Sequence, residues 1–188
     1  MKKLLLSVLF FVGGGLISFS ADITGPRYRL EGSFGFVNDK IAAKSKFFSG
    51  SISVLPEWKK QVSEKFDITF GPKATINVNF IDHGNSPAIW SNVLIGGEVD
   101  FNYRVKNNVK IYLGLEAGTG IGFQKFIKNT SASPMSSSGG SSSDNKPTLE
   151  FASISKIAFG IKLKDRYNMS IYTGDIKALL GVELGYTF

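Results

Sequence analysis

Apolar and polar residues alternate along most of the chain, and the clearest case is the segment 66–80, FDITFGPKATINVNF. Phe66, Ile68 and Phe70 begin a row of apolar or small residues at every second position, and Asp67 begins the opposing, mostly polar row. Because successive side chains of a β-strand point to opposite faces, this pattern predicts a strand with one apolar face. Pro72 has no amide hydrogen to donate, so we expect a bulge or weakened pairing at that position.

The same period of two recurs in segment after segment, which predicts an all-β protein. The expected strands cover residues 28–37, 46–54, 66–80, 92–105, 109–124, 149–163, 167–173 and 178–188. Tight turns at 106–108 and 164–166 predict hairpins. The Ser/Gly-rich tract 129–147 predicts a long, flexible, solvated loop. Residues 55–65, LPEWKKQVSEK, are expected to form a connection that is unusually long for its place between the second and third strands.

The polarity of the two faces separates a soluble barrel from a transmembrane one. Through the strongest segments the apolar row carries no Lys, Arg, Asp or Glu, whereas the other row carries the charges and many glycines. A charge that faces lipid near the midplane costs about 2–4 kcal/mol, so a lipid-facing row must lack charges. A narrow lumen has room for few large side chains, which suits the glycines. The pattern therefore predicts an eight-stranded antiparallel up-and-down transmembrane β-barrel.

The N-terminal residues predict export. Lys2 and Lys3 precede an apolar run, and small residues follow it, so residues 1–20 are interpreted as a signal peptide that is cleaved after Ser20 or Ala21. The barrel domain is then 21–188. Without the two lysines the formal charge falls from +7 to about +5, a basic excess that suits anionic lipid or polysaccharide. The chain has no cysteine, which excludes disulfides and thiol chemistry.

The last segment, ALLGVELGYTF, ends on an aromatic residue with apolar residues at alternate positions before it. With the signal peptide and about eight alternating segments, the chain resembles the small bacterial outer-membrane β-barrel proteins, the class that contains the OmpA transmembrane domain and OmpX-like barrels. In that class the barrel-assembly machinery reads the last strand. The resemblance implies that the assembly signal here consists of Leu180, Val182, Leu184, Tyr186 and Phe188. Glu183 stands where the usual signal has a glycine.

Acidic and basic residues share the face that is expected to line the lumen. The predicted lumen charge network comprises Glu31, Asp67, Lys73, Glu98, Asp100, Arg104, Lys110, Glu116, Lys156, Lys162 and Glu183. Arg29 and Glu150 fall on the same face. Mixed charges in a narrow interior favour pairing and a closed or very narrow lumen, and a general-diffusion porin needs about twice as many strands.

We therefore expect a structural role in envelope integrity, in contact with outer-membrane lipid and lipopolysaccharide. The alternatives are adhesion or surface-ligand binding through external loops, then a narrow ion channel, then a lipid-modifying enzyme. No dense patch of Lys or Arg interleaved with aromatic residues indicates nucleic acid.

Candidate catalytic chemistry is sparse. His83 is the sole histidine and lies in IDHGNSP with turn-forming residues around it, so we interpret this stretch as a polar loop. The His-x-Ser-Asn signature of outer-membrane lipid A deacylases, which resemble this chain in size, does not occur. The glycines of 118–122 fall on the lumen face of a strand, where steric relief explains them. We expect no enzyme activity, no cofactor and no metal site.

Overall fold

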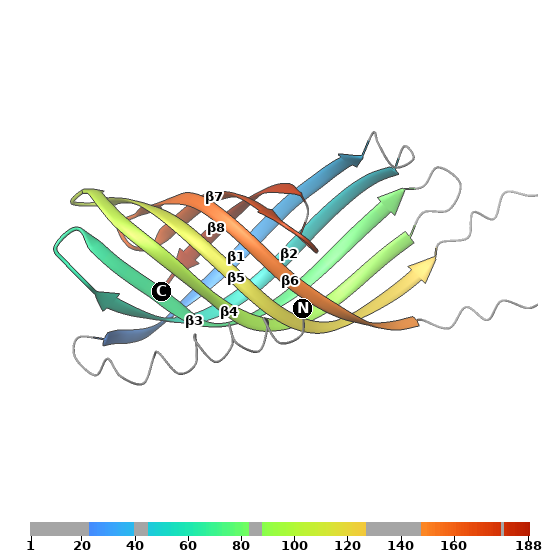
Figure 1. Ribbon diagram of the computed structural model, residues 1–188, viewed down its shortest axis with the longest axis horizontal. Coiled ribbons are helices and arrows are strands. Elements are labelled where there is room, and N and C mark those ends of the chain that lie inside the picture. The colour runs from blue at the N-terminus through green and yellow to red at the C-terminus, as the bar shows by residue number, and fades with distance from the viewer. Residues whose placement is uncertain (1–22, 40–44, 83–87, 127–147, 178) are drawn as a thin grey trace, which may run out of the picture.

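Eight antiparallel strands close into a barrel in the computed structural model, which describes residues 23–39, 45–82, 88–126, 148–177 and 179–188. Each strand pairs with the next along the chain, and the first strand pairs with the last (Figure 1). The strands are β1 (Ile23–Asp39), β2 (Ser45–Gln61), β3 (Phe66–Asp82), β4 (Ala88–Lys106), β5 (Val109–Phe126), β6 (Thr148–Leu163), β7 (Tyr167–Gly174) and β8 (Leu180–Thr187). The predicted eight-stranded, all-β, up-and-down architecture is confirmed.

The alternating sequence places apolar side chains on the outside of this barrel. Phe151 is 80% exposed and Ile95 is 69% exposed, whereas Asn77 and Asn102, which have the lumen-facing parity of their strands, are fully buried. A soluble barrel has the reverse arrangement. The exterior is therefore an apolar surface wrapped around a polar interior, which is the polarity of a transmembrane barrel.

The second strand is longer than the sequence pattern predicted, and the expected long connection at 55–65 is wrong. β2 continues to Gln61, and the β2–β3 turn is confined to residues 62–65. The sequence pattern did not indicate this continuation, because Pro56 has no amide hydrogen to donate and therefore resembles a strand end. Pairing between β2 and β3 is absent from residues 55–57 opposite 71–73, while the register on either side is unchanged. The weakened pairing expected at Pro72 is confirmed, without a bulge.

The strands differ in length, and the excess of β6 over β7 lies at one end of the barrel. β1 to β6 have 16–19 residues, whereas β7 and β8 have eight each. Figure 1 shows the two short strands ending well before the long ones. β7 pairs with β6 through Lys156 and no further. Among the described strands, residues 148–155 of β6 therefore have β5 as their one ladder partner. We call this the loop end and the opposite one, with three short turns, the turn end.

Several sequence predictions fall outside the described residues. These are the signal peptide at 1–20, the Ser/Gly-rich loop at 129–147 and the polar stretch around His83. Within the described ranges, no helix is long and apolar enough to cross a membrane.

Candidate functional site

The lumen holds a network of charged side chains contributed by every strand except β7. In the part of the chain that the structure describes, ion pairs link eight cations with eight acids. The cations are Arg27, Arg29, Lys59, Lys73, Lys110, Lys156, Lys162 and Lys177, and the acids are Glu31, Glu57, Asp67, Glu98, Asp100, Glu116, Asp165 and Glu183. This lumen network is neutral, which offsets the large desolvation cost of placing each charge inside a barrel.

Lys73 is the centre of the network. Its Nζ pairs with Glu31 and lies 2.5 Å from Glu98, 3.1 Å from Glu116 and 3.9 Å from Glu183. Carboxylate oxygens of Glu31, Glu98 and Glu183 come within 4.8 Å of one another, a spacing that suits a bound cation. The buried ammonium group of Lys73 already compensates these carboxylates, so the cluster is an internal ion-pair centre.

Arg29 extends the network toward the turn end. Its guanidinium group donates to Glu98 and, at 2.6 Å, to Asp100, and it lies 3.4 Å from Glu57. Lys162 approaches Asp100 from the other side of the lumen, with 2.8 Å between Nζ and Oδ2. Because the planar guanidinium offers five donors in a fixed fork, one arginine can join acids from β1, β2 and β4. These contacts connect strands that are not neighbours in the sheet.

A second cluster of charged residues lies at the turn end. The carboxylate of Asp165, in the β6–β7 turn, lies 2.5 Å from Lys110 Nζ and 2.8 Å from Lys59 Nζ. Lys110 also lies 2.6 Å from Asp67. Partial burial raises the pKa of the Asp165 carboxyl, but hydrogen bonds from Lys110 and Lys59 outweigh burial and hold this pKa well below its usual value. Asp165 is therefore ionised across the physiological pH range and links its turn to β2 and β5.

The β7–β8 connection reaches into the lumen from the other side. Lys177 is fully buried, with its Nζ 3.2 Å from Glu116 and 3.3 Å from Glu183. Its backbone carbonyl accepts a hydrogen bond from the Tyr172 hydroxyl at 3.1 Å. The neighbouring Ile176 packs on the small apolar cluster of Leu94, Ala152 and Ile154. The residue pair 176–177 therefore lies across the lumen above the charged centre; we call it the plug.

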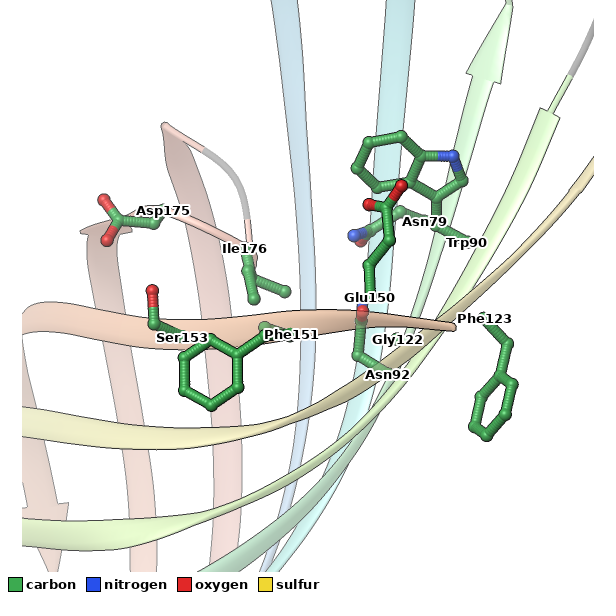
Figure 2. Close-up of a pocket in the computed structure, with 11 residues that line it drawn as sticks. Asn79, Trp90, Asn92, Gly122, Phe123, Glu150, Phe151, Ser153, Asp175 and Ile176 are labelled. Atoms are coloured by element: carbon green, nitrogen blue, oxygen red, sulfur yellow. The ribbon is translucent and has the colours of Figure 1, made fainter. Parts of the chain in front are cut away.

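Uncharged polar side chains occupy part of the lumen toward the loop end. Ser53 bonds Thr75 at 2.8 Å, and Asn77 donates to Ser49 at 2.8 Å and accepts from Asn92 at 3.1 Å. Beside this group lies a cavity of about 350 Å³, whose lining includes Asn79, Asn92, Glu150, Asp175 and Ile176. Figure 2 shows residues of this mouth cavity, which include the register partners Asn79 and Trp90, Glu150 of β6, and Asp175 and Ile176 of the β7–β8 connection.

The structure brings ten of the eleven predicted network residues into the lumen network. Arg104 is the exception: it is half-buried at the turn end, and the described residues offer its side chain no acidic partner. Arg29 joins the network, whereas Glu150 is exposed at the mouth cavity.

Sequence reasoning missed Arg27, Glu57, Lys59, Asp165 and Lys177. Glu57 could have been found, because it keeps the lumen parity of Ser53 once β2 is continued through Pro56. Asp165 and Lys177 lie in connections, where no alternation indicates direction.

The five residues of the expected assembly signal form an outward row on β8 and the residue after it. Leu180, Val182 and Leu184 are each more than half exposed, and Phe188 is 69% exposed. The rings of Tyr186 and Phe188 meet edge to face, with 4.9 Å between centroids. The row therefore has the lipid-facing direction that the sequence pattern predicted, and its role in assembly stays a prediction.

No protein-family model matches the chain, and no curated protein matches it in sequence. Several solved structures resemble it, among them the following two. The N-terminal β-barrel domain of Pseudomonas aeruginosa OprF has 9% identity and a TM-score of 0.39, over 87% of this chain and 98% of that one. The translocator domain of the autotransporter NalP from Neisseria meningitidis has 10% identity and a TM-score of 0.36, over 100% of this chain and 96% of that one.

The chain's own geometry defines its fold class. Eight antiparallel strands, circular closure, an apolar exterior and a charged interior are the features of a small transmembrane β-barrel.

Proposed function

We propose that this chain is an outer-membrane barrel with a closed lumen, whose role is structural support of the cell envelope. The neutral lumen network, together with the plug above it, is the observation that carries this proposal. Arg29, Lys73 and Lys156 cross the interior and are each no more than 2% exposed. Tightly paired, buried charges oppose the mobile ions and the continuous water column that a conducting pore requires, which supports a closed lumen.

The strand lengths support a membrane position. A tilted strand crosses a bilayer in about 9–11 residues, so the eight residues of β7 and β8 with their flanks are just sufficient. Unpaired strand edges are not tolerated in the hydrocarbon region. The one-sided part of β6, residues 148–155, therefore extends above the hydrocarbon at the loop end. Short turns are typical of the periplasmic side of such barrels, so we expect the three short turns of this chain to face the periplasm.

Conductance measurements test the closed lumen. The purified full chain, refolded in detergent and added to planar bilayers, is expected to give no reproducible large conductance steps. A general-diffusion porin in the same bilayers is the positive control, and detergent buffer is the negative control. Heat-modifiable migration on a gel verifies that the sample contains folded barrel. Regular large steps from verified barrel would contradict the closed lumen.

Deletion of the gene tests the structural role. We expect a deletion strain to release more of a periplasmic marker enzyme and to be more sensitive to detergent than its parent, and the full-length protein should restore both properties. Outer-membrane fractionation of the complemented strain establishes the location. A variant that lacks residues 130–144 should also complement, because the proposed role belongs to the barrel. Loss of complementation by this correctly located variant would favour a loop-mediated role.

A further inference from the structure

The mouth cavity has an unbalanced charge, unlike the lumen below it. Glu150 and Asp175 contribute carboxylates to its lining, and the residues that the structure describes give neither one an ion pair. The Ser155 hydroxyl donates a hydrogen bond to Asp175 at 2.6 Å. A hydroxyl carries no charge, so this bond does not neutralise the carboxylate. Every acid of the lumen network, by contrast, lies within 4 Å of a cation. Among the described residues, the lining of the cavity therefore carries a net negative charge.

A buried acceptor lies in the same cavity. Asn79 is only 2% exposed, and its side-chain oxygen has no hydrogen-bond partner. Leaving such an oxygen unpaired costs about 1–3 kcal/mol. The unpartnered Asn79 oxygen is an observation independent of the two carboxylates. Asn79, Glu150 and Asp175 all contribute to the lining of this cavity (Figure 2). All three groups are hydrogen-bond acceptors when the acids are ionised, so they complement a ligand that donates.

Part of the wall of the mouth cavity is apolar. Ala152 and Ile176 belong to the cavity lining and also to the apolar cluster that the plug covers. A volume of about 350 Å³ is at the lower end of small-molecule sites. A hydrated metal ion would leave the apolar walls unused, whereas an amine with an aliphatic body would contact both the walls and the acids.

We propose that the mouth cavity binds a small organic cation, an aliphatic amine or diamine. Its ammonium groups would donate to Glu150, Asp175 and the Asn79 side-chain oxygen, and its methylene groups would pack on Ile176. The site lies above the plug, so it is independent of whether the lumen conducts. Binding here is a property beyond the structural role.

Titration with 1,4-diaminobutane tests this site. The chain has two tryptophans, Trp58 and Trp90, and Trp90 lines the cavity. In a Trp58→Phe background, refolded in detergent, Trp90 fluorescence reports on the cavity directly. We expect a saturable change with the diamine and at least a tenfold weaker response to 1,4-butanediol, which has similar length but no charge.

Charge-neutralising variants complete the experiment. The double variant Glu150→Gln/Asp175→Asn should raise the Kd for the diamine at least tenfold. Glu64→Gln is the matched control, because Glu64 is an exposed acid in the β2–β3 turn, at the opposite end of the barrel; its Kd should not change. Each variant is verified as folded by heat-modifiable migration. The proposal is overturned by an absence of saturable binding, an equal response to the diol, or an unchanged Kd in the double variant.

Discussion

Lys177 Nζ lies 3.2 Å from the carboxylate of Glu116, across 61 positions of sequence, and this contact holds the β7–β8 connection inside the lumen. Lys177 has a second partner, Glu183, on the adjacent β8. Both glutamates also lie near Lys73 and Lys156. The contact therefore joins the plug to the charged centre.

Lys177→Met should lower the free energy of unfolding by about 1–3 kcal/mol, because it leaves a buried carboxylate short of one donor. The loss is limited since Lys73 and Lys156 remain. Urea titration of the refolded barrel in lipid vesicles measures it. Lys164→Met, in an exposed turn, is the control. A double-mutant cycle with Glu116→Gln should give a coupling energy above about 0.5 kcal/mol, and zero coupling would show that the contact does not stabilise the plug.

Lys73→Met should be the most destabilising single neutralisation in the lumen. Four glutamates lie around this ammonium group, and removing one partner of a buried pair costs about 3–5 kcal/mol. The same urea titration measures the loss, with Lys106→Met at an exposed strand end as the control. Lys73→Met/Glu98→Gln should recover part of the stability, because it restores neutrality. A single variant as stable as the control would contradict the central role of Lys73.

Asp165→Asn should remove a pH-dependent contribution to stability. The folded-state pKa of Asp165 lies below the unfolded value of about 3.9. The ionised carboxylate therefore stabilises the fold fully above that value, and the contribution is lost as the pH falls below it toward the folded pKa. We expect wild type to exceed Asp165→Asn by an order of 1 kcal/mol near pH 7, after allowance for solvent screening.

The difference between wild type and Asp165→Asn should shrink below about pH 4. Unfolding titrations from pH 3 to pH 7 measure it. Glu64→Gln, at an exposed acid without an ion pair in the described structure, is the control. A difference that grows on acidification has the wrong sign for this mechanism.

Gly120→Ala should disturb the β4–β5 packing. A Cβ atom at Gly120 would lie 1.9 Å from the backbone oxygen of Val93 and 2.8 Å from Leu94 Cα. Backbone atoms cannot move aside as a flexible side chain can, so a cost of about 1–3 kcal/mol is expected. Gly50→Ala is the matched control, because nothing lies within 4 Å of its added Cβ. Equal refolding yields and unfolding midpoints for the two variants would refute this packing argument.

The alternation of residues was enough to predict the barrel and its polarity. A strand has a period of two, so an apolar row without charges, opposed by a row with charges and glycines, defines which face meets lipid. The same logic found Glu31, Lys73, Glu98 and Glu183 in the interior. The predicted second strand ended before Pro56, because a residue without an amide hydrogen resembles a strand end. Glu57 and Lys59, which follow in β2, were therefore not predicted to line the lumen.

What the tertiary structure alone decided is which charges meet and where the β7–β8 connection enters the lumen. Pairing depends on the stagger between strands that are distant in sequence, which sets Lys73 of β3 among glutamates of β1, β4, β5 and β8. The inward path of Lys177 depends on the shortness of β7 and β8 beside longer neighbours. No local periodicity encodes either feature, because side-chain direction in a connection is set by the contacts that it makes and not by its sequence parity.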